Sequence, residues 1–286
     1  MIRIITDTAA NLPAELIQKY NIIVVPLSYT INDVQATQNP AENFNGTEFY
    51  NAMRSGADIK TSMSGIDSFI KPFKTALEQD CDIMYLGISG GISGTVNAAR
   101  LAADELKKDF PNRKIIIIDT LAASLGEGLQ VLTAAEMIKN GFDIDTVEQN
   151  IASIKKRMCQ FFTVDDLNYL KKGGRISGAT AVVGTMLNIK PILTGDEEGK
   201  IVSCGRVRGK RVALANLAEK YMRLAQDKAA DIGIAHADDK DGAEILLTEL
   251  KKRGFYGNCI TVCYEPVTGA HVGPGTVALF FLGIHK

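Results

Sequence analysis

Small polar residues are concentrated between Gly87 and Gly94, a stretch that holds four glycines and two serines. The apolar segment Ile83–Ile88 leads into it and predicts a buried strand, and a helical pattern begins at about Thr95. Glycines let the backbone come close to a ligand, serine hydroxyls donate hydrogen bonds, and the first turn of a helix has unpaired N–H groups. Together these features predict a pocket for an anion.

The glycine-serine loop departs from two nucleotide-binding motifs and matches a hydrolytic one. No lysine follows its glycines as in a P-loop, and Gly90-Gly-x-x-Gly94 lacks the spacing of a dinucleotide site. The segment Gly87-Ile-Ser89-Gly-Gly91 does match the G-x-S-x-G pattern of serine hydrolases. A triad would need His271 or His236 with an acid such as Asp238, and the predicted helix begins later than such an elbow requires. A serine esterase therefore remains the alternative function.

A second pair of hydroxyls, on Thr61 and Ser62, comes just before another predicted helix. In an open parallel sheet, ligands lie beyond the carboxyl ends of the strands, so these hydroxyls can reach the crevice of the glycine-serine loop. Capping of the helix is the alternative role for both residues.

Other polar residues give weaker signals. A basic run, Arg206 to Arg211, is a solvated face, a surface that docks an acidic partner or a group that helps to bind an anion. The histidines lack metal-ligand spacing, so no metal is expected. His271 lies among glycines and a proline, which predicts a glycine-rich loop before the last strand.

The elements that must position these residues indicate an α/β protein with two domains. In the first half, apolar strands alternate with helices, which predicts a Rossmann-like parallel sheet; one helix is expected to start at Asn11 as its N-cap. The second half has a hairpin around Gly195–Gly199 and a small, apolar helical stretch at Ala179–Leu187, so a mixed sheet is expected. The domains are predicted at residues 1–155 and 156–286.

Composition limits the class of protein. Of 286 residues 46% are hydrophobic and 23% charged, and the net charge is -1, which favours an ordinary globular protein over a nucleic-acid or membrane-surface binder. Five scattered cysteines and the lack of a signal peptide predict a cytoplasmic protein with reduced thiols. The longest apolar run, Val277–Ile284, is far shorter than the roughly 20 residues of a membrane helix, so no membrane insertion is expected.

Several spaced motifs, taken together, resemble the DegV family of bacterial fatty-acid-binding proteins. They are Ile4-Ile-Thr-Asp7-Thr8, Thr61-Ser-x-Ser64, Ile88-Ser-x-x-Ile-Ser-Gly-Thr95, Asp166-Leu-x-Tyr-Leu-Lys-Lys-Gly-Gly-Arg175-Ile, Leu187-Asn-Ile-Lys-Pro-Ile192 and His271-Val-Gly-Pro-Gly275. The resemblance covers essentially the whole chain and implies a long-chain fatty acid, such as palmitate, in an apolar tunnel between two α/β domains.

The resemblance also implies site residues and a partner. The carboxylate would be held by Thr61, Ser93 and the Gly94 N–H, supported by a network of further residues: Ser62, Arg175, His271 and Arg206. A separate fatty acid kinase would phosphorylate the bound carboxylate, so the chain itself would have no catalytic residues and no cofactor. The tunnel walls are expected from Ala179–Leu187 and Val277–Leu282. The family often has proline where this chain has Met63, a departure that affects the loop carrying Thr61.

Overall fold

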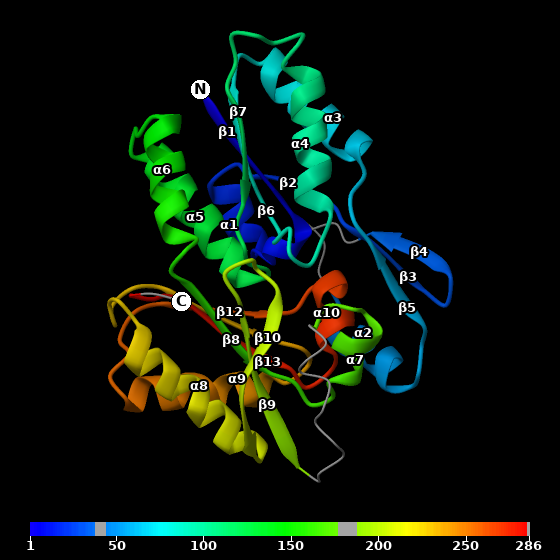
Figure 1. Ribbon diagram of the computed structural model, residues 1–286, viewed down its shortest axis with the longest axis vertical. Helices are drawn as coiled ribbons and strands as arrows, with labels where there is room; N and C mark the ends of the chain where they lie inside the picture. The colour runs from blue at the N-terminus through cyan, green and yellow to red at the C-terminus, as the bar shows by residue number, and fades with distance from the viewer. Residues whose placement is uncertain (38–43, 177–187, 285–286) are drawn as a thin grey trace.

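The computed structural model describes residues 1–37, 44–176 and 188–284, and Figure 1 shows its two principal sheets one above the other. The first, sheet A, has the order β2-β1-β6-β7 and is parallel throughout, as predicted. Its strands are β1 (Ile2–Asp7), β2 (Ile23–Val25), β6 (Asp82–Gly87) and β7 (Ile115–Asp119). Short helices follow β1: η1 (Thr8–Ala10) and α1 (Ala14–Lys19).

Helices cover both faces of sheet A because its strand residues alternate between two cores. Ile5, Ile83 and Tyr85 pack against α3 (Ile66–Glu78) and α4 (Thr95–Leu106). Ile4, Met84 and Leu86 face the opposite side, where α5 (Leu125–Lys139) lies with α6 (Ile144–Ile154) packed on it.

The second sheet, sheet C, is mixed, as expected, with the order β10-β9-β8-β13-β11-β12. Among the strand pairs of this sheet in the described residues, β11–β12 is parallel and the others are antiparallel. Its strands are β8 (Met158–Thr163), β9 (Ile189–Gly195), β10 (Ile201–Arg208), β11 (Ile232–His236), β12 (Cys259–Cys263) and β13 (Val277–Leu282). One face packs on α8 (Lys210–Leu224) and α9 (Lys240–Lys252), and the connections of this half carry α7 (Asn168–Lys172) and α10 (Pro266–Val272).

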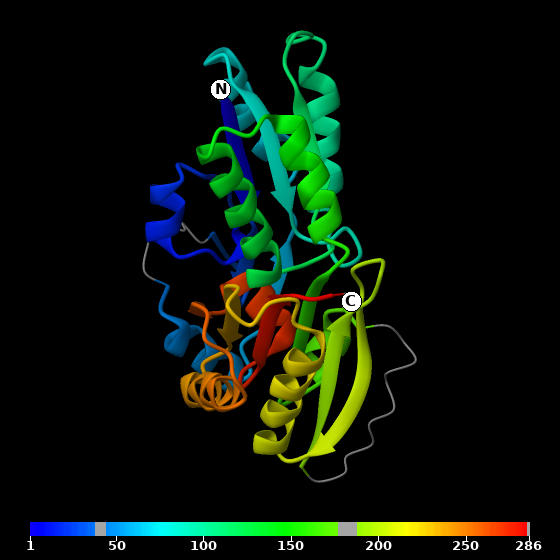
Figure 2. The same cartoon turned by 90° about the vertical axis from the view of Figure 1, so that its left-hand side faces the viewer.

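Helix α5 joins the two halves, since it contacts β1 and β6 of sheet A and β8, β11 and β13 of sheet C. Figure 2 shows sheet A above and sheet C below the region where α5 contacts both. Gly126 permits the close approach: a Cβ there would lie 2.9 Å from Gln160 Oε1 and 3.0 Å from the Phe280 ring. The predicted boundary at residue 155 falls between α6 and β8, and the division into domains stays a prediction.

The polar segment after Ser28 forms a third, three-stranded antiparallel sheet with the order β4-β3-β5. Its strands are β3 (Ser28–Ile31), β4 (Val34–Thr37) and β5 (Ile59–Ser62), and α2 (Gly46–Arg54) precedes β5. In Figure 1 this sheet lies beside α2, α7 and α10. The Tyr50 hydroxyl of α2 donates to the Tyr264 carbonyl at 3.0 Å, which ties this part of the first half to the second.

Three local predictions were wrong. Asn11 does not cap α1: it ends η1 in the left-handed region at φ 54°, and Pro13 takes the N-cap position. Thr61 lies on a strand rather than in a loop, because β5 pairs with β3. His271 lies on α10 rather than in a glycine-rich loop, because the Glu265 carboxylate accepts hydrogen bonds from two N–H groups of the first turn. The predicted helix at 179–187 is outside the described residues.

Candidate functional site

A cleft lies where the carboxyl ends of the sheet A strands meet one face of sheet C. It encloses about 850 Å³ of space free of protein, open mouth included. Its apolar lining comes from both halves of the chain and includes Leu27, Ile88, Ile92, Phe162, Ile201, Val267, Val272 and Phe280. The arrangement is suited to a long apolar ligand.

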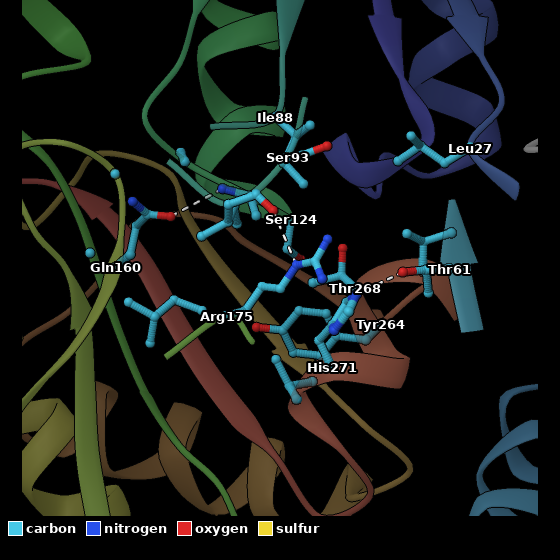
Figure 3. A pocket seen from close by; sticks show the side chains of 18 of the residues that line it. Leu27, Thr61, Ile88, Ser93, Ser124, Gln160, Arg175, Tyr264, Thr268 and His271 are labelled. Atoms are coloured by element: carbon cyan, nitrogen blue, oxygen red, sulfur yellow. Dashed lines mark hydrogen bonds between the residues drawn. The ribbon is translucent and has the colours of Figure 1, made fainter. Parts of the chain in front are cut away.

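Five of the predicted site residues line this cleft: Ser62 and four that are labelled in Figure 3, Thr61, Ser93, Arg175 and His271. Figure 3 shows them approaching the cavity from separate elements, Thr61 from β5, Ser93 from the loop before α4 and His271 from α10. Thr61 Oγ1 lies 2.8 Å from His271 Nε2, within a hydrogen bond. Thr61, Ser93, Arg175 and His271 are together called the polar wall below.

Ser93 both supports the start of α4 and faces the cleft. Its Oγ accepts a hydrogen bond from the Thr95 N–H at 3.3 Å and lies 2.9 Å from the Thr95 hydroxyl. Its own N–H donates to the Ser89 carbonyl at 3.0 Å. The turn therefore fixes the position of the Ser93 hydroxyl next to the positive end of the α4 dipole, which favours an anion there.

The glycines before Arg175 have separate structural roles. A Cβ at Gly173 would collide with Nδ1 of His271, and Gly174 adopts the left-handed region at φ 68°. The Arg175 side chain then donates from Nε to the Ile92 carbonyl at 3.2 Å and from Nη1 to the Gly173 carbonyl at 2.6 Å. Within the described residues its Nη2 makes no hydrogen bond, so one guanidinium nitrogen is available to a ligand.

His271 is neutral at pH 7. Burial, and to a smaller extent the positive charge of Arg175, lowers the pKa of its imidazole to about 4. The positive charge of the polar wall therefore comes from Arg175, while His271 and Thr61 supply hydrogen-bonding groups.

The structure separates two predicted residues from the cleft lining. Gly94 is exposed next to Ser93, and a Cβ on it would lie 2.5 Å from Sδ of Met63. Arg206 is exposed on the edge strand β10, five residues beyond the cleft-lining Ile201, so it does not join the polar wall. Ser62, by contrast, does line the cleft.

The esterase alternative does not fit the geometry of Ser89. This residue is 1% exposed, and its hydroxyl donates to the Gly199 carbonyl at 2.9 Å. The two histidines that could act as the general base have other partners. His271 is hydrogen-bonded to Thr61, and Nδ1 of His236 accepts a hydrogen bond from the Asp239 N–H. A nucleophile must lie within hydrogen-bond reach of its base, and Ser89 instead fastens a backbone loop.

Sequence reasoning missed several polar residues of the cleft. Gln160 Oε1 accepts from the Ala123 N–H at 3.2 Å, and its Nε2 donates to the Leu121 carbonyl at 3.0 Å, which fastens the turn before α5. A glutamine within an otherwise apolar strand was the available signal. Thr268 Oγ1 is buried at the cleft without a hydrogen-bond partner in the described part of the chain. Within Val277–Leu282, only Phe280 lines the cleft.

Two further features are absent from residues 1–37, 44–176 and 188–284. No cluster of three or more histidine, cysteine or acidic side chains there is arranged to bind a metal ion. No helix in these ranges combines the length and apolar character that spanning a membrane requires.

Comparison with known proteins places the chain among proteins of one family. A family model described as "Uncharacterised protein, DegV family" matches residues 1–283. A DegV domain-containing protein of Clostridium perfringens is 34% identical over 284 residues, which are 99% of this chain and 98% of that protein.

Solved structures agree with this placement. A DegV family protein of Thermus thermophilus, described as binding fatty acid, has a TM-score of 0.90 and 32% identity, with 99% of each chain covered. A fatty acid binding DegV family protein of Streptococcus agalactiae has a TM-score of 0.88 and 30% identity, covering 100% of this chain and 99% of its own. The resemblance seen in the sequence motifs is therefore confirmed.

Proposed function

The chain belongs to the DegV family, and from this membership and the geometry of the cleft we propose that it binds one long-chain fatty acid, such as palmitate. The acyl chain would lie among the apolar side chains, and the carboxylate would accept hydrogen bonds from Thr61 and Ser93. The observation that carries the proposal is a largely apolar cleft that ends in a polar wall with one cation, Arg175.

The energetics support this assignment. About 15 buried methylenes contribute roughly 0.8 kcal/mol each, or about 12 kcal/mol before ordering costs, so the chain supplies most of the affinity. A buried carboxylate is costly unless it is hydrogen-bonded and its charge is balanced. The hydroxyls, the start of α4 and Nη2 of Arg175 meet both requirements.

The distribution of donors on the polar wall favours a ligand whose carboxylate remains reactive. The single N–H of Arg175 Nε donates to the Ile92 carbonyl, so the guanidinium cannot clamp the carboxylate through Nε and Nη2, and Nη1 is already shared with the Gly173 carbonyl. We propose that one carboxylate oxygen stays free for a separate kinase. That oxygen would attack the γ-phosphorus of ATP, forming an acyl–phosphate O–P bond as the bond to the ADP oxygen breaks.

Lipid extraction tests the ligand. Organic extraction of the purified protein followed by mass spectrometry should recover about one long-chain fatty acid per chain. In a binding assay, Thr61→Val and Ser93→Ala should each weaken palmitate by about tenfold to a hundredfold, the value of a hydrogen bond to a charged group. The same two variants should reduce the affinity for hexadecanol, which carries no charge, by a smaller factor. The exposed Ser203→Ala is the matched control. Unchanged palmitate affinity in both variants would contradict the assigned carboxylate contacts.

Charge reversal tests the kinase partner. Arg206 and Arg208 are exposed on β10, so replacing both by Glu should slow phosphorylation of the bound fatty acid and leave the cleft loaded. The exposed Arg100 and Lys108, reversed in the same way, provide the control. Equal phosphorylation rates at physiological salt would exclude this surface as the docking site.

A further inference from the structure

Besides the polar wall, the cleft is lined by three buried polar side chains, those of Tyr264, Ser124 and Gln160. They are 3%, 1% and 9% exposed, so a ligand that fills the cleft removes them from water. Tyr264 directly follows β12, Ser124 lies in the turn before α5, and Gln160 is on β8. Figure 3 shows all three around the cavity, with the ring of Tyr264 directed into it.

The Tyr264 hydroxyl makes no hydrogen bond to any of the described residues. Two of the other buried tyrosines do have partners. The Tyr50 hydroxyl donates to the Tyr264 carbonyl at 3.0 Å, and the Tyr85 hydroxyl donates to the Asp7 carboxylate at 2.7 Å. Burial raises the pKa of the Tyr264 phenol, so it keeps the proton that it can donate. An unused donor and acceptor therefore meet the space of the cleft.

Ser124 and Gln160 each have one further unused donor. The Ser124 hydroxyl accepts from Asn11 Nδ2 at 3.3 Å, and its own proton has no acceptor in the part of the chain that the structure describes. Gln160 Nε2 uses one of its two N–H groups for the Leu121 carbonyl. Because Gln160 Oε1 accepts from the N–H of Ala123, the residue before Ser124, these two side chains are neighbours.

The position of Tyr264 assigns it to the chain of the ligand rather than to its carboxylate. Tyr264 precedes α10 and His271 is in the last turn of this helix, so about 10 Å, at 1.5 Å per residue, separates their backbones. A separate groove between β5, α7 and α10 is lined by Thr61, Arg175 and His271. Tyr264 lines only the cleft, so its hydroxyl meets the apolar interior.

A plain hydrocarbon chain cannot use these donors. Methylenes packed against a buried hydroxyl displace its water and offer no acceptor in exchange, which costs free energy. A hydroxyl or carbonyl oxygen on the chain restores the hydrogen bond, while the neighbouring methylenes keep their apolar contacts. A site with buried donors therefore discriminates against a ligand that lacks the matching oxygen.

We propose that the cleft prefers an acyl chain that carries a hydroxyl or carbonyl oxygen between its carboxylate and its far end, and that Tyr264 recognises this oxygen. The inference rests on the proposed function, since the same cleft must bind the chain, and it narrows the ligand class to oxygenated fatty acids. The Tyr264 hydroxyl donates to the chain oxygen. Ser124 and Gln160 offer donors to an oxygen at another position along the chain.

Hydroxypalmitates that differ only in the position of the hydroxyl test this inference against palmitate in one displacement assay. One isomer should bind the wild type at least as tightly as palmitate, and tighter than the palmitate with a methyl group at the same position. Tyr264→Phe should lower the affinity of this isomer relative to palmitate by about tenfold, because the isomer loses a hydrogen bond while palmitate no longer covers an unpaired hydroxyl. Tyr221→Phe removes a buried hydroxyl outside the cleft lining and should leave the ratio unchanged.

Palmitate itself should bind Tyr264→Phe no more weakly than the wild type, a result that misfolding cannot imitate. A ratio that stays within about twofold for every isomer would overturn the inference alone, and equal weakening of all ligands would place the phenol at the carboxylate. The inference also fails if no isomer matches palmitate in the wild type. Failure of the wild type to bind palmitate and every hydroxypalmitate would overturn the proposed function.

Discussion

Thr61, Ser93, Arg175 and His271 come from four separate segments of the chain, yet each has a local reason for its position. Ser93 is fixed by Thr95, Arg175 by two backbone carbonyls, and His271 by Thr61. The polar wall is therefore held in place by protein hydrogen bonds, which lowers the ordering cost of binding a head group.

Titration of His271 should report a bound carboxylate. Because burial and Arg175 lower its pKa to about 4, the empty protein should keep this imidazole neutral down to about pH 5. An anion placed beside the ring favours the imidazolium, so palmitate should raise this pKa. NMR of the ring signals measures it, with His236 as the control outside the cleft lining. An unchanged pKa on loading would show that the carboxylate lies elsewhere.

Sequence reasoning found these residues but not their contacts. Residue types and family motifs pointed to Thr61, Ser93, Arg175 and His271, whereas the Thr61–His271 hydrogen bond joins positions 210 apart in the chain. Arg206 was expected in the supporting head-group network because it matches an arginine that follows the hairpin in the family, and in the structure it is exposed on the edge strand β10, outside the cleft lining. In each case the position of the side chain depends on contacts between residues far apart in the chain, which local sequence patterns do not reveal.

The elements that close the cleft meet at the glycine-serine loop. The Ser89 hydroxyl donates to the Gly199 carbonyl in the β9–β10 turn, and a Cβ at Gly91 would collide with the Glu198 carbonyl of the same turn. The hairpin of the second half thus packs directly on the loop of the first. Gly91 permits this approach because it lacks a side chain.

Gly91→Ala should loosen this packing. The obstacle is backbone, which cannot rotate away, so we expect a loss of about 1–3 kcal/mol in the free energy of unfolding and faster dissociation of a bound fatty acid. Chemical denaturation and stopped-flow displacement measure the two effects. Gly65→Ala is the matched control, since nothing lies within 4 Å of a Cβ there. Equal stability of both variants would show that the hairpin does not depend on this contact.

Helices and strands were predicted correctly where the sequence signal is local, and were missed where the element depends on contacts with distant residues. Strand β6, helix α4 and the β9–β10 hairpin have strong local patterns, and all three were found at about their predicted positions. Strand β5 and helix α10 were missed because β5 depends on pairing with β3 and α10 on a cap from buried Glu265. Pro266 at the first turn of α10 was a start signal that the neighbouring glycines obscured.

At the scale of the whole molecule, buried carboxyl groups lie close to the junction of the halves. Asp7 ends β1, Glu127 is in the first turn of α5, and Glu265 caps α10. Each is at most 2% exposed, and burial raises the pKa of all three. The charge of Asp7 also raises the pKa of Glu127 and of Glu265, and the charge of Glu265 raises that of Glu127, so the protonation of these carboxyl groups is coupled.

Stability should therefore fall as pH rises from 6.5 to 8. The pKa of Glu265 is raised from 4.5 to about 7, so the folded state holds a proton that the unfolded state has already lost, and deprotonation in this range destabilises the fold. The single group contributes a fall of about 1 kcal/mol over this range. His271, with its lowered pKa, acts in the opposite sense, mainly between about pH 4 and 6.5. Because an unfolded imidazole is still about half protonated at pH 6.5, the remainder of this effect offsets part of the fall above pH 6.5.

Glu265→Gln isolates the Glu265 contribution. The glutamine keeps one acceptor for the first turn of α10 and cannot ionise, so the variant should be less stable at pH 6.5 but should lose less stability between pH 6.5 and 8 than the wild type. Urea unfolding at several pH values measures the slope. Asp143→Asn, at an exposed N-cap whose carboxyl pKa is lowered, leaves the slope in this range unchanged and serves as the control. Parallel slopes for the wild type and Glu265→Gln would place the titrating group elsewhere, with Asp7 and Glu127 as the next carboxyls to replace, because burial raises their pKa in the same direction.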